Sequence, residues 1–385
     1  MTHTVVQLKG SEFDEGMEFL NMVFGAHSPH DFAAMLPSIY QPTDEHMANN
    51  YAVREDGQLR AIVGMFPMTW KVGDRALKVA GIGGVSTHPE ARGKGHMRTL
   101  MDHCVHLMRD QGYHLSWLGG QRQRYLYFGY EKCGSSYGFT LNKSNLRHSF
   151  IGPSSLHFEP LADDRADRLE RIVSLHDGQV AHAVRPRADF ARYLVSWYHR
   201  PWVALDGHGE MVGYLVASES GDRVFELVAV DDTMALEMVK AWTANHCEGS
   251  ATFDVHPWSA RLAQLLARYC EQISVSCTGN WQVVDWPGAL DAIITLAQGC
   301  IPLEDGEVVV QVQGAATIRL SVSGGEARCE DATGAAPDLA CNAPTAMRVL
   351  FGPLKPSAVC DLPPAAQALE SWCPLPLSWG RQDGV

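Results

Sequence analysis

The sequence predicts a protein of mixed α/β and α+β class, with two units built on mixed sheets flanked by helices and a smaller third unit. The chain has 385 residues, which is too long for one ordinary domain. Residues 79–118 have the pattern of strand, glycine-rich turn, helix and strand. A meander followed by a helix recurs over residues 202–245, and from residue 281 the pattern changes to short strands and helices.

The elements before the glycine-rich turn follow from short apolar runs and the turn residues between them. Residues 12–24 carry apolar side chains at helical spacing, and Glu55-Asp56-Gly57 separates two β-rich runs. In chain order we expect a strand at residues 4–8, a helix at 12–24, partly helical residues at 30–36, and strands at 51–54, 59–68, 70–72, 76–79 and 79–85.

The turn that follows residues 79–85 has the composition of an anion site. Glycines at 93 and 95 lie between Arg92 and a helix whose apolar face is marked by Met97, Leu100, Met101, Cys104 and Met108. The first turn of a helix presents unpaired N–H groups and partial positive charge, and glycines allow a phosphate to approach the backbone. The alternative is an ordinary glycine-rich turn in an α/β domain.

This segment resembles the acetyl-CoA loop of the GNAT acetyltransferases, Gln/Arg-x-x-Gly-x-Gly/Ala. Arg92 and Gly95 match, whereas Met97 stands where the family usually has glycine or alanine. Residues 125–130, YLYFGY, resemble the Tyr-x-x-φ-Gly-φ segment that follows the next strand in that family, where φ is apolar or aromatic. The resemblance implies that Tyr125 is the general acid that protonates the departing CoA thiolate. The alternative for Tyr125 is packing in an aromatic cluster.

The resemblance also implies which residues bind acetyl-CoA, the expected co-substrate. In the family, the central strand and the loop after the following strand hold the pantetheine arm, and the glycine-rich loop holds the pyrophosphate. The corresponding residues here are Val85, Ser86, Thr87, Arg92, Gly93, Lys94, Gly95, His96, Met97, Arg98, Gly120 and Gln121.

The rest of the chain extends the resemblance to the enhanced-intracellular-survival (Eis) type of acetyltransferase. That type joins an active GNAT domain, a degenerate GNAT-like domain and a sterol-carrier-like domain, which we expect at residues 1–147, 148–280 and 281–385. In that group the last residue's α-carboxylate returns to the active site as general base, so the resemblance assigns this role to Val385. The alternative is a frayed tail, although apolar residues at 374–379 favour a docked one.

We therefore expect an N-acetyltransferase in which a primary amine attacks acetyl-CoA directly. Catalysis by a cysteine is a weaker hypothesis, because Cys104 lies on the apolar face of its helix and Cys133 has no nearby histidine in the sequence. Trp70, Trp117 and His30 are candidates for the acceptor pocket, with core packing favoured for both tryptophans. The acceptor amine stays open among aminoglycosides, polyamines and lysines. The alternative function is a non-catalytic protein that binds acyl-CoA or an apolar ligand on the same scaffold.

Composition limits the partners. The formal net charge of −13 argues against nucleic acid and anionic membranes, and no apolar run has the length of a membrane span. The ten cysteines form no CxxC pair, and His103 and His106 lack further ligands, so we expect no metal. No secretion signal begins the chain, so we expect a cytoplasmic protein. The resemblance implies a homo-oligomer, often a hexamer.

Overall fold

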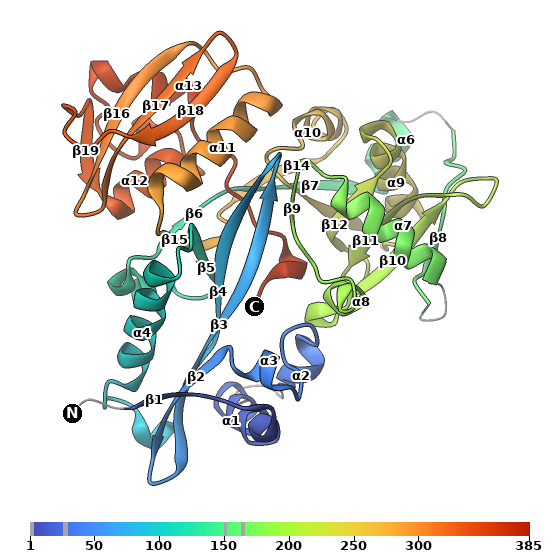
Figure 1. Cartoon of the computed structure of the whole chain (residues 1–385). Coiled ribbons are helices and arrows are strands. Elements are labelled where there is room, and N and C mark those ends of the chain that lie inside the picture. Colours follow the sequence, from blue (N-terminus) through green and yellow to red (C-terminus); the bar gives the residue numbers. More distant parts are fainter. Residues whose placement is uncertain (1–3, 26–29, 150–151, 163–165) are drawn as a thin grey trace.

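In the part of the chain that the structure describes, three β-sheets are each covered by helices (Figure 1). The computed structural model describes residues 4–25, 30–149, 152–162 and 166–385. Each sheet combines antiparallel neighbours with one parallel pair. The prediction of several mixed sheets flanked by helices is therefore confirmed.

The first sheet runs in the order β1-β2-β3-β4-β5-β15-β6, with β9 paired to β3. Alternate residues of β3 enter two cores: Val63 packs on one face with α4, and Ile62 packs on the other with α1. The strands are β1 (Val5–Gln7), β2 (Asn50–Glu55), β3 (Gln58–Val72), β4 (Arg75–Thr87), β5 (Leu115–Leu118), β6 (Glu131–Cys133), β9 (Ala181–Ala183) and β15 (Gly279–Val283). The helices are α1 (Phe13–Phe24), α2 (Phe32–Met35), α3 (Asp44–Met47), α4 (His96–Asp110) and α5 (Arg122–Tyr125).

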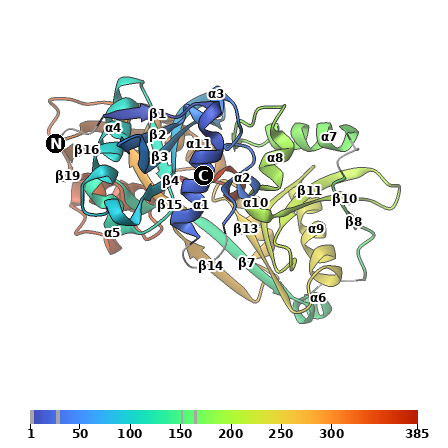
Figure 2. The same cartoon turned by 90° about the horizontal axis from the view of Figure 1, so that it is seen from below.

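The second sheet runs in the order β14-β7-β13-β12-β11-β10-β8 and lies beside the first (Figure 2). Its core packs α9 against the sheet around Trp242 and Phe253. The strands are β7 (Ser136–Asn142), β8 (His157–Pro160), β10 (Arg200–Leu205), β11 (Met211–Ala217), β12 (Arg223–Ala229), β13 (Ser250–Val255) and β14 (Gln272–Ser276). The helices are α6 (Lys143–Ser149), α7 (Ala166–Asp177), α8 (Phe190–Leu194), α9 (Asp232–Asn245) and α10 (Ala260–Leu266).

The third sheet is the smallest, with the order β18-β17-β16-β19. Its apolar residues share one continuous core with Trp70, Trp117 and Trp281 of the first sheet, so the two units are packed as one body. The strands are β16 (Gly306–Gln313), β17 (Ala316–Ser323), β18 (Glu326–Asp331) and β19 (Leu339–Asn342), and the helices are α11 (Trp286–Cys300), α12 (Ala343–Phe351) and α13 (Ala368–Trp372).

The three sheets are interleaved along the chain. The chain leaves the first sheet after Cys133 and enters the second at Ser136, before the boundary expected at 147/148. It returns to the first sheet twice, as β9 beside β3 and as β15 between β5 and β6. The division at 147/148 and 280/281 stays a prediction, and the strand pairing shows that contiguous segments do not coincide with sheets.

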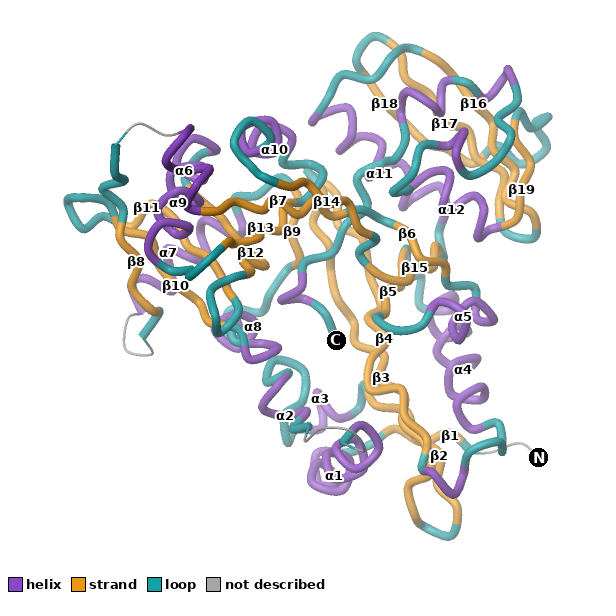
Figure 3. The backbone as a smooth tube through the Cα atoms, turned by 180° about the vertical axis from the view of Figure 1, so that it is seen from behind, coloured by secondary structure: helices purple, strands orange, loops and turns teal. Residues whose placement is uncertain are grey.

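The C-terminal segment returns from the third unit to the middle of the molecule, between the first and second sheets (Figures 1 and 3). It ends in a short 3-10 helix, Arg381–Asp383, followed by Gly384 and Val385. The tail is therefore docked in the fold. Among the described residues, no helix is long and apolar enough to cross a membrane.

Candidate active site

A gap opens in the first sheet where two parallel strands separate. β4 pairs with β5 from Val79 to Ile82, but β5 ends at Leu118 while β4 continues to Thr87. Residues 83–85 of β4 and 119–121 after β5 line a pocket of about 480 Å³, which we call the strand-gap pocket. Residues 83–85 of β4 therefore have no neighbouring strand on the β5 side, and their backbone groups can hydrogen-bond to a ligand.

A β-bulge in β4 shapes one wall of this pocket. Ile62 pairs with Ser86 and Gly64 pairs with Gly83, so two residues of β4 lie opposite one residue of β3. Gly84 lies inside the bulge at φ 58°, and a Cβ there would lie 2.8 Å from the Tyr40 hydroxyl oxygen. Glycine is therefore required for both conformation and space. The bulge leaves backbone polar groups outside the regular ladder at the pocket wall.

Tyr125 lies at the end of α5 and lines the strand-gap pocket. The ring packs over Gly120, where a Cβ would lie 3.0 Å from its Cε2 atom. Burial raises the pKa of Tyr125, and the neighbouring Arg124 only partly opposes this. The phenol is therefore protonated at neutral pH and can donate a proton.

Val385 lines the same pocket, against the glycines of β4. A Cβ at Gly83 would lie 3.0 Å from the carboxyl carbon of Val385, and one at Gly81 would lie 2.9 Å from its Cγ2 atom. Larger residues at these positions would displace the tail. The two residues predicted to be catalytic, Tyr125 and Val385, are thus brought to one pocket.

Specific side-chain contacts hold the tail in place. Gln382 is buried, and its Nε2 donates to the carbonyl oxygens of Tyr193 and Leu194 at 2.9 and 3.1 Å. Trp379 Nε1 donates to the carbonyl oxygen of Asp383 at 2.8 Å. The terminal residues are therefore anchored from the second unit and from within the tail itself.

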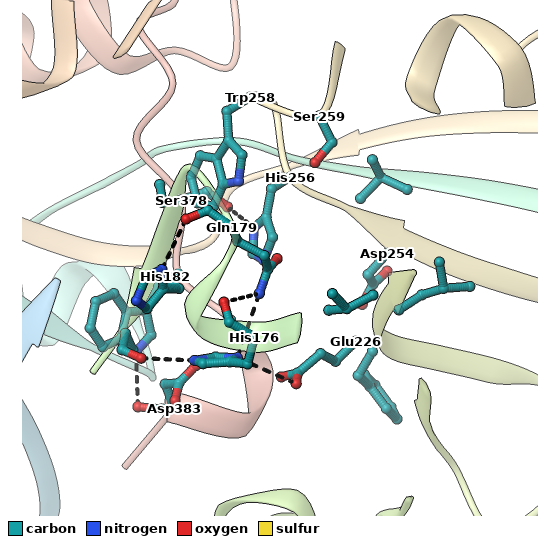
Figure 4. A pocket seen from close by; sticks show the side chains of 18 of the residues that line it. His176, Gln179, His182, Glu226, Asp254, His256, Trp258, Ser259, Ser378 and Asp383 are labelled. Carbon is teal, nitrogen blue, oxygen red and sulfur yellow. Dashed lines mark hydrogen bonds and ion pairs between the residues drawn. The ribbon is translucent and has the colours of Figure 1, made fainter. Parts of the chain in front are cut away.

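Asp383 takes part in a buried ion network beside a small internal cavity (Figure 4). Arg185 Nε donates to Asp383 Oδ1 at 2.7 Å, and Arg185 Nη2 donates to Glu226 Oε2 at 2.6 Å. Figure 4 shows Glu226 and Asp383 on either side of His176, with His256, Trp258 and Ser378 farther up in the view. Burial raises the pKa of Glu226, but Arg185 outweighs it and brings this pKa down to about 2.

His256 is buried against the C-terminal segment and makes the stability of the fold sensitive to acid. Its Nδ1 lies 3.0 Å from the Ser378 hydroxyl oxygen, and its ring stacks on Trp258 with centroids 4.3 Å apart. Burial lowers the pKa of His256 from 6.5 to about 4. Between these values the unfolded chain binds a proton that the folded chain does not, so the free energy of unfolding falls as the pH is lowered from 6.5 to 4.

We expect urea unfolding of the wild type to show about 2 kcal/mol less stability at pH 5 than at pH 7 on account of this one histidine. The variant His256→Gln should lose that share of the pH dependence. His208→Gln, in the exposed β10–β11 turn, is the matched control and should keep the wild-type profile. Equal profiles for wild type and His256→Gln would contradict the assignment.

A second groove, of about 580 Å³, lies at the N-terminus of α4, and we call it the α4 groove. Gly95 caps the helix at φ 87°, Gly93 lies at φ 81°, and added Cβ atoms would meet nothing within 4 Å. Arg92 and Arg98 line the groove, beside the N–H groups of the first helical turn. The groove therefore has the donors and charge to bind a phosphate group. Arg124 lines both this groove and the strand-gap pocket, and so connects them.

Ten of the twelve residues expected to bind acetyl-CoA line one of these two sites. In the strand-gap pocket they are Val85, Gly120 and Gln121, and in the α4 groove they are Thr87, Arg92, Gly93, Gly95, His96, Met97 and Arg98. Ser86 and Lys94 line neither. Ser86 Oγ donates to the carbonyl oxygen of Ile62, and Lys94 Nζ donates to Glu55 at 2.9 Å. The ring of His96 is buried, 3.2 Å from Glu55, and so its backbone is what the groove offers.

Of the three residues considered for the acceptor pocket, one lines the strand-gap pocket and the two tryptophans are buried in the core. His30 lines the strand-gap pocket, Trp70 is 1% exposed in the core, and Trp117 Nε1 donates to the carbonyl oxygen of Thr278. Trp197 and Arg381 also line the strand-gap pocket, and neither is predicted from the sequence. Their sequence positions carry no motif, although Arg381 lies in the tail whose docking was predicted.

Known proteins resemble this chain in its first unit and in its overall fold. Residues 4–133 match the family model described as acetyltransferase (GNAT) domain. None of the curated proteins compared matches the chain in sequence. Among solved structures, a GCN5-related N-acetyltransferase from Kribbella flavida is 18% identical over 99% of this chain and 98% of its own, with a TM-score of 0.66.

Two further structures are similar over the same length. A GCN5-related N-acetyltransferase from Anabaena variabilis is 18% identical and Eis1 from Mycobacterium abscessus is 15% identical, each over 98% of both chains with a TM-score of 0.66. At such identities the similarity shows the fold. The chain thus contains an acetyltransferase (GNAT) domain at residues 4–133 and shares its overall fold with GCN5-related N-acetyltransferases.

Proposed function

We propose that the protein is an acetyl-CoA-dependent N-acetyltransferase that acetylates a primary amine by direct attack. The observation that carries the proposal is the meeting of a buried phenol, Tyr125, and the terminal residue, Val385, in one pocket at the separated strands β4 and β5. A phenol and a carboxylate are a suitable acid and base for transfer from a thioester to an amine.

Acetyl-CoA fits the two connected sites in one orientation. Its pyrophosphate would lie in the α4 groove against Arg92, Arg98 and the first N–H groups of α4. Its pantetheine arm would follow the unpaired end of β4 toward Gly120 and Tyr125. The thioester would then lie in the strand-gap pocket, where the acid and the base are found.

Val385 and Tyr125 each carry out one of the two proton transfers of the reaction. The Val385 carboxylate accepts the proton that the amine nitrogen loses as it bonds to the acetyl carbon. A backbone N–H at the Gly84 bulge stabilises the oxyanion that forms. Tyr125 then donates its proton to the sulfur as the carbon–sulfur bond breaks, so the products are the N-acetyl amine and CoA thiol.

The test of this function is release of CoA thiol from acetyl-CoA, with protein that ends at its native Val385. A panel of primary amines is needed, and titration calorimetry measures acetyl-CoA binding separately. Thiol release that requires both an amine and the protein supports the transferase. Saturable binding without release for any amine would mean that the acceptor lies outside the panel. Absence of both binding and release would contradict the transferase and favour the non-catalytic alternative.

The variant Tyr125→Phe is expected to lower kcat about 10²-fold, while the KM for acetyl-CoA stays within about threefold. The reason is that the phenol acts only as the thiolate departs, and a thiolate is already a good leaving group. Steady-state kinetics at saturating acetyl-CoA measures this. Tyr137→Phe, on β7 in the core of the second sheet, is the matched control and should behave as wild type. An unchanged kcat for Tyr125→Phe would remove this residue from the mechanism.

The variant Arg92→Gln is expected to raise the KM for acetyl-CoA about tenfold and to leave kcat unchanged. Arg92 is exposed at the α4 groove and offers a charged donor to a phosphate. Kinetics with acetyl-CoA as the varied substrate measures the change. Arg109→Gln, in the last turn of the same helix, should leave the KM as in the wild type. Equal effects of the two substitutions would contradict a specific phosphate contact.

The expectations for the C-terminal unit also enter the proposal. A sterol-carrier-like layer is supported by the four-stranded sheet with α11 packed on it, from which the tail returns to the strand-gap pocket. A homo-oligomer stays a prediction. The edge strand β14 supports it, since all five of its residues are exposed and include Ile273 and Val275.

A further inference from the structure

The strand-gap pocket has an apolar aromatic wall in addition to Tyr125 and Val385. It is formed by Phe24 of α1, by Phe32 and Met35 of α2, and by Leu36, which follows α2. The rings of Phe24 and Phe32 meet edge to face with centroids 4.9 Å apart, and Phe32 packs in the same way on Tyr40 at 5.7 Å. Such a wall binds an apolar or aromatic body, and it supplies no carboxylate that could pair with additional ammonium groups.

The charges in the pocket point the same way. Among the described residues that line it, the terminal carboxylate of Val385 is the one anionic group, and no aspartate or glutamate side chain is present. Arg124 and Arg381 also line the pocket and bring two guanidinium groups to it. A polycationic acceptor would place its second and third ammonium groups near these cations and without carboxylate partners.

Arg381 has no carboxylate of its own in the described part of the chain. Its guanidinium carbon lies 3.9 Å from the centroid of the Trp197 ring, and no ion pair joins it to a described acidic side chain. Burial and the nearby Arg223 lower the pKa of Arg381, and Asp254 only partly opposes them. Arg381 lines the strand-gap pocket, so an anionic group of a ligand bound there can reach its guanidinium group.

Trp197, which holds Arg381 at the pocket, is itself held in a strained backbone. Trp197 and Tyr198 have φ values of 63° and 61°, which residues with side chains rarely adopt. The Tyr198 hydroxyl donates to the carbonyl oxygen of Asp31 at 3.2 Å, which fixes this turn against the start of α2. Strained backbone of this kind is concentrated at functional sites, and Trp197 lines the strand-gap pocket. The second sheet's unit thus contributes a residue to the site of the first.

We propose that the acceptor is an amino carboxylate with an apolar, preferably aromatic, body, as in L-phenylalanine or L-tryptophan. The amine is placed against the Val385 carboxylate, the carboxylate of the acceptor pairs with Arg381, and the aromatic body lies on the wall formed by α1 and α2. This inference rests on the proposed function and names the substrate class of the same pocket.

The test compares kcat/KM for L-phenylalanine, 2-phenylethylamine and spermidine with the full, untagged chain. L-phenylalanine should exceed 2-phenylethylamine at least about tenfold, because only the former has a carboxylate for Arg381. Spermidine should be the poorest acceptor. Arg381→Gln should lower kcat/KM for L-phenylalanine about 30-fold and change it less than about threefold for 2-phenylethylamine. The exposed Arg328→Gln in the third unit is the matched control.

Several outcomes would overturn the inference. If spermidine is the best acceptor, or if Arg381→Gln affects both aromatic amines equally, the acceptor class is wrong while the N-acetyltransferase stands. If acetyl-CoA binds saturably but none of the three amines is acetylated, the acceptor class is again wrong. If acetyl-CoA does not bind at all, the proposed function fails, and the inference fails with it.

Discussion

Conversion of the terminal carboxylate of Val385 to a carboxamide is expected to lower kcat about 10²–10⁴-fold, with little change in acetyl-CoA binding. The amide keeps the size of the group beside Gly83, but it cannot accept the proton that the attacking amine loses. Expressed-protein ligation of a short C-terminal peptide amide provides this protein, and a ligated peptide acid provides its control. The measurement is CoA-thiol release at saturating acetyl-CoA and amine.

The variant Val385→Ala distinguishes the contribution of the terminal carboxylate to kcat from that of the valine side chain. It keeps the α-carboxylate and removes two methyl groups that pack near Gly81, so we expect less than about a tenfold loss of kcat. Acetyl-CoA binding, measured by calorimetry, should be unchanged in both proteins. A carboxamide protein as active as the ligated acid would show that another group, or water, accepts the proton.

The part of the site that the sequence could predict is the part made by consecutive residues. A strand, two glycines and an amphipathic helix follow one another from β4 to α4, and both Gly93 and Gly95 do adopt the positive φ that such a turn requires. Tyr125 lies shortly after β5 in the sequence, so its place in the site also follows from the order of neighbouring elements. Local patterns of this kind depend on local sterics and hydrogen bonding, which neighbouring residues determine.

Pairing between distant strands could not be predicted in the same way. β15 was recognised only as part of a changed pattern from residue 281, and it lies between β5 and β6. β7 and β14, which pair with each other in the second sheet, were not expected as strands. Strand register is set by which surfaces are buried together, and that information is distributed over the whole chain.

The acceptor side of the pocket also depends on contacts between distant residues, which the sequence does not predict. Trp197 follows α8 in the second sheet's unit, and its positive φ contradicts the local preference of a tryptophan. Nothing nearby in the sequence indicates that it lies over Arg381 in the tail. The contact exists because the second unit and the docked tail meet at the first sheet's gap, so only the assembled fold reveals it.

Arg185→Leu is expected to lower the free energy of unfolding by about 3–5 kcal/mol. The side chain of Arg185 is fully buried and bonds to both carboxylates, with Nη1 and Nη2 on Glu226 at 3.1 and 2.6 Å and Nε and Nη2 on Asp383 at 2.7 and 2.9 Å. Its removal leaves two buried carboxylates without their cation. Urea unfolding, followed by tryptophan fluorescence at pH 7, measures the loss.

The matched control is Arg187→Leu, because Arg187 forms an exposed pair with Glu170 and should cost less than about 1 kcal/mol. Arg185→Lys should recover part of the stability, since it keeps a charge but cannot bond to both carboxylates in the planar, bidentate way of arginine. Asp383 lies two residues before Val385, so Arg185→Leu should also release the tail and lower kcat at temperatures where the protein is still folded. Full activity in a folded Arg185→Leu protein would show that Gln382 and the glycine-lined wall of β4 are sufficient to place the terminal carboxylate, and that the ion network serves stability alone.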